Sequence, residues 1–228
     1  MLNALIFALL LALASILSET IFLKKRRSGK HGISLLWKAA ASGSFCLTGA
    51  VLAGASGSPQ GPVICLGLTM GLMGDVLLGL RKLFPGQHDL AFRAGALAFS
   101  VGHVFYMIAL GQTARLPWAP VLLIFLVLMA GAELFARRGG FAKHKMHLPG
   151  LLYIGIEACM AAMALTLPWL HRTPGAFLFA AGSLSFFCSD SLLCAYSFGT
   201  MKTLSCDRAV HVTYLCAQLL IAFSVPFL

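Results

Sequence analysis

Charged residues are scarce in this chain of 228 residues, at 11% of the total against about 25% in soluble domains. Apolar residues make up 59%, against roughly 45–50% in soluble domains. A soluble fold with this composition has too little polar surface to cover itself. The composition therefore excludes a soluble enzyme, a disordered tail and a secreted disulfide scaffold, and indicates a polytopic membrane protein.

Paired cysteine motifs are also missing, because the seven cysteines never form a CxxC pattern. Without that spacing, neither a zinc-finger site nor a redox motif has support. Nearly all the cysteines lie inside apolar runs, where we expect them to act as small packing residues.

Apolar runs of about 20 residues, the length needed to cross a bilayer as a helix, occur eight times. They are about twice as long as the strands of a membrane β-barrel and do not alternate, so we expect an all-α integral membrane protein. The first run has no basic segment before it and is too long for the core of a signal peptide, so we expect it to be retained. The runs leave no room for a soluble domain, and we expect a single transmembrane domain over 1–228. The predicted spans are 2–23, 34–54, 62–80, 91–111, 117–135, 149–167, 175–197 and 209–228.

Basic residues outnumber acidic residues by 17 to 7, which gives a net charge of +10. On the eight-span layout, two of them, Arg115 and Arg172, lie on one side of the membrane and fifteen on the other. The positive-inside rule puts the fifteen in the cytoplasm and both termini outside. This placement explains the basic excess without a nucleic-acid partner, and the bilayer is the expected contact. The fifteen are Lys24, Lys25, Arg26, Arg27, Lys30, Lys38, Arg81, Lys82, Arg93, Arg137, Arg138, Lys143, Lys145, Lys202 and Arg208.

Acidic residues are the rarest charged type, and an ionisable side chain inside a span marks function by default. Four of the seven acids are explained without chemistry, two by nearby basic residues and two by predicted loops. These four are Glu19 near Lys24, Glu133 near Arg137, Asp89 and Asp207. The three that remain inside spans are Asp75, Glu157 and Asp190.

Two of these acids, Asp75 and Asp190, have similar sequence surroundings. The segments GDVLLG and SDSLLC share a D-x-L-L core 115 residues apart, and each is followed one span later by H-x-x-Y. The H-x-x-Y pairs are His103 with Tyr106 and His211 with Tyr214. The pattern favours two parallel four-helix repeats.

Asp75 shares a helix face with Gly67, Gly71 and Gly79. Small residues at this spacing allow close helix contact, so we expect Asp75 to face the interior of the bundle. The ionisable residues gather in the cytoplasmic halves of the predicted spans. We therefore expect one polar cavity that opens toward the cytoplasmic leaflet.

Simpler interpretations of these residues also stand. Each aspartate alone suits a buried polar tie to a neighbouring helix. Tyr153 and Tyr214 suit anchors at the membrane interface, and His211 an interfacial residue. Glu157 suits a protonated hydrogen-bond donor to a neighbour.

Four segments together resemble the YhhN family of eight-span membrane proteins, which includes the lysoplasmalogenases. They are GLMGDVLLGLRKLF, GALAFSVGHVFYMIAL, AGSLSFFCSDSLLCAYSF and YLCAQLLIAFS. The resemblance implies a hydrolase that cleaves the vinyl-ether bond of lysoplasmalogens to a fatty aldehyde and a glycerophospho-base. It also implies that Asp75 and Asp190 carry the reaction. Glu157 departs from the family pattern, because an apolar residue is expected there.

A mechanism that fits these residues uses two carboxyl groups. One protonates the vinyl-ether carbon and the other, as a carboxylate, activates water and stabilises the cation. Arg81 and Lys82 are expected to contact the phosphate of the lysophospholipid. The residues expected to orient substrate or water are His103, Tyr106, Tyr153, Glu157, His211, Tyr214 and Gln218.

Alternatives from other functional classes are a transporter and a non-catalytic lipid-binding protein. A transporter needs polar groups along its whole path, and the outer half of the spans has almost none. A divalent metal held by Asp75, Asp190, His103 and His211 is a minor alternative, because a vinyl ether has no carbonyl for a metal to polarise. We therefore expect no cofactor. Short loops suit a bacterial cell membrane and the endoplasmic reticulum equally, and no oligomeric state is specified.

Overall fold

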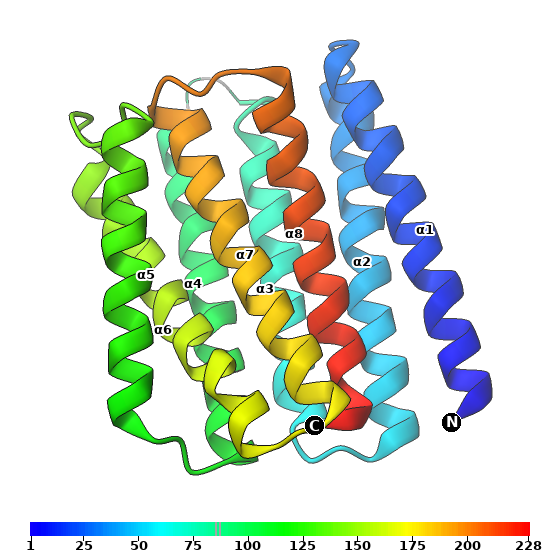
Figure 1. Cartoon of the computed structure of the whole chain (residues 1–228). Coiled ribbons are helices and arrows are strands. Elements are labelled where there is room, and N and C mark those ends of the chain that lie inside the picture. The colour runs from blue at the N-terminus through cyan, green and yellow to red at the C-terminus, as the bar shows by residue number, and fades with distance from the viewer. Residues whose placement is uncertain (85, 87) are drawn as a thin grey trace. The chain divides into compact units, whose positions relative to one another are not determined.

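The computed structural model describes residues 1–84, 86 and 88–228, and over these residues it contains eight α-helices and no strand (Figure 1). All eight are long and apolar enough to cross a membrane. The predicted all-α, eight-span fold is therefore confirmed. The helices are α1 (Leu2–Arg27), α2 (His31–Ser56), α3 (Gly61–Leu80), α4 (His88–Thr113), α5 (Trp118–Arg138), α6 (His147–Leu170), α7 (Pro174–Phe198) and α8 (Leu204–Ser224).

Several helices extend past the predicted spans, since polar residues continue the helix beyond the apolar run. The clearest case is α8, where the side chain of Thr203 accepts a hydrogen bond from the backbone N–H of Cys206 and caps the helix. Asp207 therefore lies in the first turn of α8, where the helix dipole favours a negative charge. Asp89 likewise falls within the bounds of α4. The prediction that Asp89 and Asp207 lie in loops is wrong.

The chain divides into two compact units, Met1–Ala109 (unit 1) and Leu110–Leu228 (unit 2), with the boundary near the end of α4. The expectations of one transmembrane domain over 1–228 and of a parallel repeat stay predictions.

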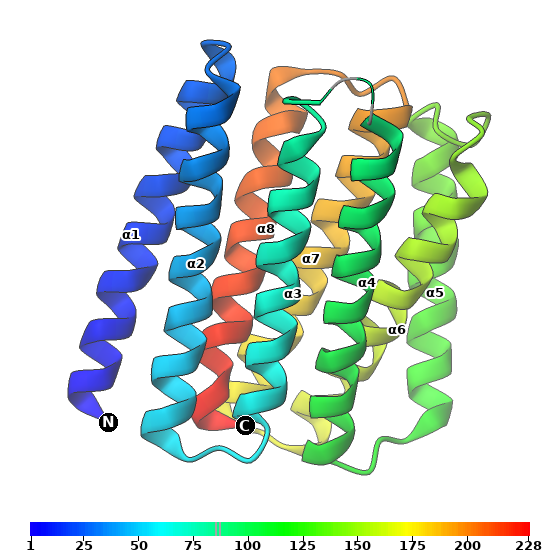
Figure 2. The same ribbon diagram turned by 180° about the vertical axis from the view of Figure 1, so that it is seen from behind.

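In unit 1, α1 packs on α2 and α2 packs on α3. Figure 2 shows α3 and α4 side by side, and their contact depends on glycine. A Cβ atom at Gly67 would lie 2.3 Å from the ring of Tyr106, and one at Gly74 would lie 2.7 Å from the ring of Phe99. Two aromatic rings of α4 thus pack directly on the backbone of α3, at Gly67 of the predicted small-residue face and at Gly74, which the prediction did not include.

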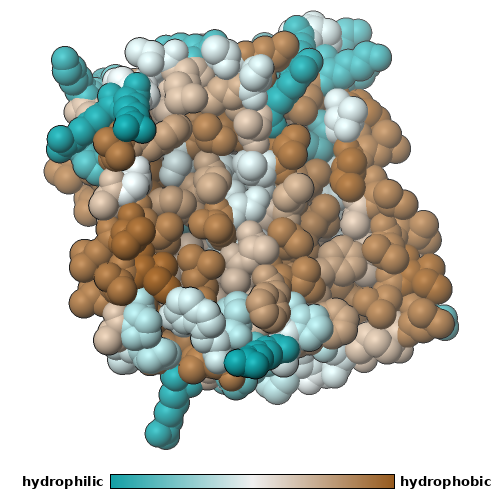
Figure 3. Space-filling model, in the orientation of Figure 1, coloured by the Kyte–Doolittle hydropathy of each residue, from teal (hydrophilic) through white to brown (hydrophobic). Residues whose placement is uncertain are grey.

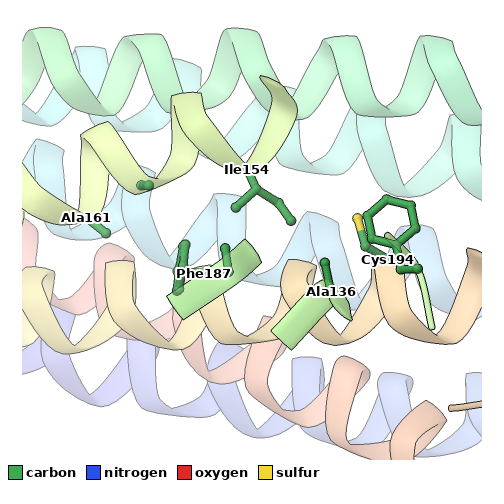
Figure 4. Packing of buried hydrophobic residues seen from close by; sticks show 8 residues of the cluster. Ala136, Ile154, Ala161, Phe187 and Cys194 are labelled. Atoms are coloured by element: carbon green, nitrogen blue, oxygen red, sulfur yellow. The ribbon is translucent and has the colours of Figure 1, made fainter. Parts of the chain in front are cut away.

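In unit 2, the helices from α5 to α8 pack in chain order, and the short 3-10 helix η2 (Val225–Phe227) returns to α7. Buried apolar residues from α5, α6 and α7 form a hydrophobic core (Figure 4). Its members include Ala136, Ile154, Ala161, Phe187 and Cys194. This core holds α6 and α7, the helices that carry Glu157 and Asp190, in a fixed register.

The surface has the distribution expected for membrane helices. In Figure 3, hydrophobic residues cover the middle of the helices, and hydrophilic residues gather at the helix ends. The chain is a multi-pass membrane protein, with helices suited to a lipid bilayer.

Candidate active site

Asp75 is buried in unit 1, as its glycine-rich helix face predicts, with 6% of its surface exposed. Two residues of α2 hold its carboxylate. Ser42 donates a hydrogen bond of 2.5 Å from Oγ to Oδ2, and the Lys38 ammonium lies 3.4 Å from Oδ1. Different groups therefore contact the two oxygens, and the orientation of the carboxylate is defined.

Lys38 is itself buried, with 5% of its surface exposed, and it is paired with Glu19 of α1. Its Nζ lies 3.2 Å from Oε1 and 3.1 Å from Oε2 of Glu19. The prediction that Lys38 is a basic residue on the cytoplasmic side that only determines the topology is wrong. The prediction that nearby Lys24 accounts for Glu19 is also wrong, because Glu19 pairs with Lys38. The reason is tertiary: α1 and α2 are antiparallel neighbours joined by a short turn, so residues 19 and 38 face each other.

One sequence signal could have revealed Lys38, because it lies inside the predicted span 34–54. An ionisable residue inside a span marks function by default, whichever charge it carries.

His103 and Tyr106 lie on one face of α4, as their spacing predicts. Both side chains are buried, and their ring centroids are 6.5 Å apart. The Tyr106 ring rests on Gly67 of α3, two turns before Asp75.

Asp190 of α7 is buried in unit 2, and it accepts a hydrogen bond from the hydroxyl of Tyr153 on α6. Tyr153 therefore binds a carboxylate, and the interpretation as an interface anchor is wrong for it. Ser183 and Cys194, seven residues before and four residues after Asp190 on α7, are also buried.

Glu157 lies one helical turn after Tyr153 and is fully buried, with 0% exposure. A carboxylate oxygen of Glu157 lies within 4.8 Å of one from Asp190. Within the described part of the chain, neither oxygen of Glu157 has a hydrogen-bond partner. Unit 2 thus contains two neighbouring carboxyl groups with unequal surroundings: Asp190 has a phenol donor and Glu157 has no donor.

Tyr214 and Gln218 of α8 are both buried, and Gln218 Nε2 donates to the Tyr214 hydroxyl at 3.3 Å. The Tyr214 ring packs edge-on against Phe186 of α7, so the anchor interpretation is wrong for Tyr214 as well. His211 is half-buried, with Nε2 4.0 Å from an oxygen of Asp207.

Comparison with models of protein families matches residues 33–225 to the YhhN family. The chain belongs to the YhhN family. The resemblance stated from the sequence motifs is thereby confirmed. No curated protein and no solved structure matches the chain.

The match to the YhhN family covers most of the buried polar residues described above. Lys38, Asp75, Glu157 and Asp190 all lie within the matched range. Glu19 lies outside it, on α1.

Arg81 and Lys82, the residues expected to contact phosphate, lie at the end of α3. The guanidinium of Arg81 stacks 5.8 Å from the ring centre of Phe92, and Lys82 is exposed. A phosphate contact by this YhhN-family chain stays a prediction.

The metal alternative also stays a prediction. Of the four residues predicted as ligands, Asp75 and His103 belong to unit 1, and Asp190 and His211 to unit 2. Within unit 2, Asp190 has Glu157 as a neighbouring carboxylate.

Proposed function

We propose that this YhhN-family protein is a membrane hydrolase that cleaves the vinyl-ether bond of lysoplasmalogens. The products are a fatty aldehyde and a glycerophospho-base. The observation that supports the proposal best is the pair of buried carboxyl groups in unit 2, Asp190 and Glu157, with the Tyr153 hydroxyl on one of them. A general acid and a general base side by side are what this hydrolysis needs.

The reaction consumes one water and needs no oxidant. A carboxylic acid gives its proton to the vinyl carbon that is not bonded to the ether oxygen. The other vinyl carbon, which is bonded to that oxygen, becomes the centre of an oxocarbenium ion. Water attacks that carbon and loses a proton to a carboxylate, which gives a hemiacetal. The hemiacetal then collapses to the aldehyde and the free hydroxyl of the glycerophospho-base. Carboxylate pairs support similar cations in glycoside hydrolysis.

The surroundings of the two acids in unit 2 suggest their roles. A buried carboxyl group without a hydrogen-bond donor is stable only in its neutral form, because a buried charge without a partner is costly. Glu157 is in this situation, and in our proposal it is the proton donor. Asp190 accepts a hydrogen bond from Tyr153, which stabilises a carboxylate, and in our proposal it is the base that activates water.

Asp75 enters the proposal as a second catalytic aspartate through the family resemblance. Its support in unit 1, with Lys38 on one oxygen and Ser42 on the other, suits a carboxylate that stays charged and oriented during a reaction.

The test supplies purified protein with a vinyl-ether lysolipid and, separately, with the ester lysolipid as a control. We expect aldehyde from the first and no fatty acid from the second. Asp190→Asn and Asp75→Asn should each lower aldehyde release by about 100- to 10,000-fold. Glu133→Gln, at a peripheral ion pair with Arg137, is the matched control and should retain activity.

Near-normal release by either folded aspartate variant would remove that residue from the mechanism. Binding of the lysolipid without any aldehyde, unchanged when both aspartates are replaced, would instead favour the lipid-binding alternative.

A further inference from the structure

Three helices of unit 1 meet at a single buried ammonium group. Lys38 of α2 contacts Glu19 of α1 at 3.1 Å and Asp75 of α3 at 3.4 Å. The side chains of all three residues are only 6% exposed. Lysine is almost never buried without a partner, so this placement needs an explanation.

Lys38 lies closer to Glu19 than to Asp75, and this difference indicates which of the two carboxylates anchors it. Both oxygens of Glu19 lie within 3.2 Å of Nζ, and Oδ1 of Asp75 lies slightly farther away, at 3.4 Å. Glu19 therefore anchors the ammonium, and the ammonium in turn reaches Asp75. Ser42, one turn further along α2, contacts the other oxygen of Asp75.

We propose that Lys38 is a positioning residue for Asp75, with Glu19 as the anchor of Lys38. The ammonium fixes the orientation of the Asp75 carboxylate and compensates its charge, so Asp75 presents one defined geometry during the reaction. This inference rests on the proposed catalytic role of Asp75. It adds Glu19 of α1, a helix outside the range matched to the family, to the residues that support the reaction.

The first test compares Lys38→Met, Lys38→Arg and the control Lys30→Met, which removes an exposed positive charge from the adjoining turn. The assay measures kcat and KM for aldehyde release. We expect Lys38→Met to lower kcat by about 100-fold with KM unchanged, because a misplaced carboxylate costs about that much. Lys38→Arg keeps the charge and should recover most of the loss, and Lys30→Met should match the wild type. A folded Lys38→Met with wild-type kcat, or a folded Lys38→Arg that recovers nothing, would overturn the proposal.

Exchanging the charges of residues 19 and 38 distinguishes positioning of Asp75 from stabilisation of the contact between α1 and α2. The double variant Glu19→Lys with Lys38→Glu keeps the ion pair between α1 and α2, but it puts a carboxylate beside Asp75. We expect its unfolding temperature to recover toward the wild type while kcat stays as low as in Lys38→Met. Recovery of kcat would show that only the helix pairing matters.

Ser42→Ala keeps the proposal testable if the Lys38 variants do not fold. It removes one hydroxyl from Asp75 and leaves the ion pair in place. We expect kcat to fall by about tenfold, as for the outer contacts that orient metal ligands. The unfolding temperature should fall less than in Lys38→Met, because the buried carboxylate keeps its ammonium partner. An unchanged kcat would count against the fixed orientation of Asp75.

A readout without catalysis distinguishes failure of this inference from failure of the proposed function. If the wild type releases no aldehyde, the proposed function fails, but the coupling of Lys38 to Asp75 is still measurable. Lys38→Met, Asp75→Asn and the double variant form a thermal-unfolding cycle. We expect Lys38→Met to lower the unfolding temperature less in the Asp75→Asn background, because no charged Asp75 is then left without its partner. Additive shifts would overturn the positioning role whatever the activity.

Discussion

At the scale of single residues, Glu157 is the most informative side chain in unit 2. Its neighbours along α6, Ile154 and Ala158, belong to the hydrophobic core, and an apolar residue would suit the position. A carboxyl group buried there without a donor is destabilising unless it is neutral. The cost favours a chemical role over a structural one.

Two replacements test this role of Glu157. Glu157→Gln keeps the shape of the neutral acid but has no proton to transfer, and Glu157→Leu restores the apolar pattern. Both should fold, and both should lose about 100-fold or more of the aldehyde release expected from the wild type. The measurement is kcat at matched amounts of folded protein. A fully active Glu157→Leu would show that Glu157 is a bystander to the reaction.

Lys38 is a second residue whose role depends on its surroundings, as the role of Glu157 does, but it carries a positive charge. Counted by position in the sequence, it belongs with the basic topology residues. In the structure its ammonium lies between two carboxylates of other helices. A buried ion pair adds little stability over apolar packing, but the loss of one partner is strongly destabilising, by about 3–5 kcal/mol. Such a group is better explained by what it orients than by the stability it adds.

At the scale of helices, the contact of α3 with α4 depends on glycine. Tyr106 lies so close to Gly67 that any side chain at this position would displace the ring. Asp75 is two turns further along the same helix, and it directly follows Gly74, whose backbone the Phe99 ring of α4 covers.

Gly67→Ala should therefore lower stability, by about 1–3 kcal/mol, because the extra methyl overpacks a close helix contact. Gly43→Ala on α2, where a Cβ atom meets nothing within 4 Å, is the matched control and should be neutral or slightly stabilising. Thermal unfolding in detergent compares the two variants. Equal unfolding temperatures would mean that α4 moves away from α3 at no cost.

At the scale of the whole molecule, the distribution of basic residues predicts the orientation in the membrane. The burial of Lys38 leaves fourteen basic residues at helix ends and loops on one side, against two on the other. That asymmetry is still large enough for the positive-inside rule to place the basic side in the cytoplasm.

Reporter fusions test the orientation. A reporter that is active only outside the cytoplasm should be active when fused after residue 228. The same reporter should be inactive when it is inserted at residues 142–145, between α5 and α6. An even number of spans requires the N-terminus to lie on the same side as residue 228. Opposite results for the two ends would contradict the eight-span topology.

Sequence alone was sufficient for the architecture, for a reason particular to membranes. A bilayer satisfies no backbone hydrogen bonds, so each apolar run of about 20 residues must become a helix. Acids are so rare in this chain that Asp75, Glu157 and Asp190 could be selected without a structure, and all three are buried. The family was recognisable from the segments around two of these acids.

Tertiary structure alone decided which groups these acids meet. In a soluble helix the polar face shows which side is outward, but a membrane helix is apolar on both its lipid side and its protein side. Periodicity therefore does not specify the rotation of a helix or the depth of its partner. The pairing of Lys38 with Glu19 and Asp75, and of Tyr153 with Asp190, depends on those two variables. The amino-acid sequence thus determined the spans and the acids, and the packing of antiparallel helices determined which side chains lie beside each acid.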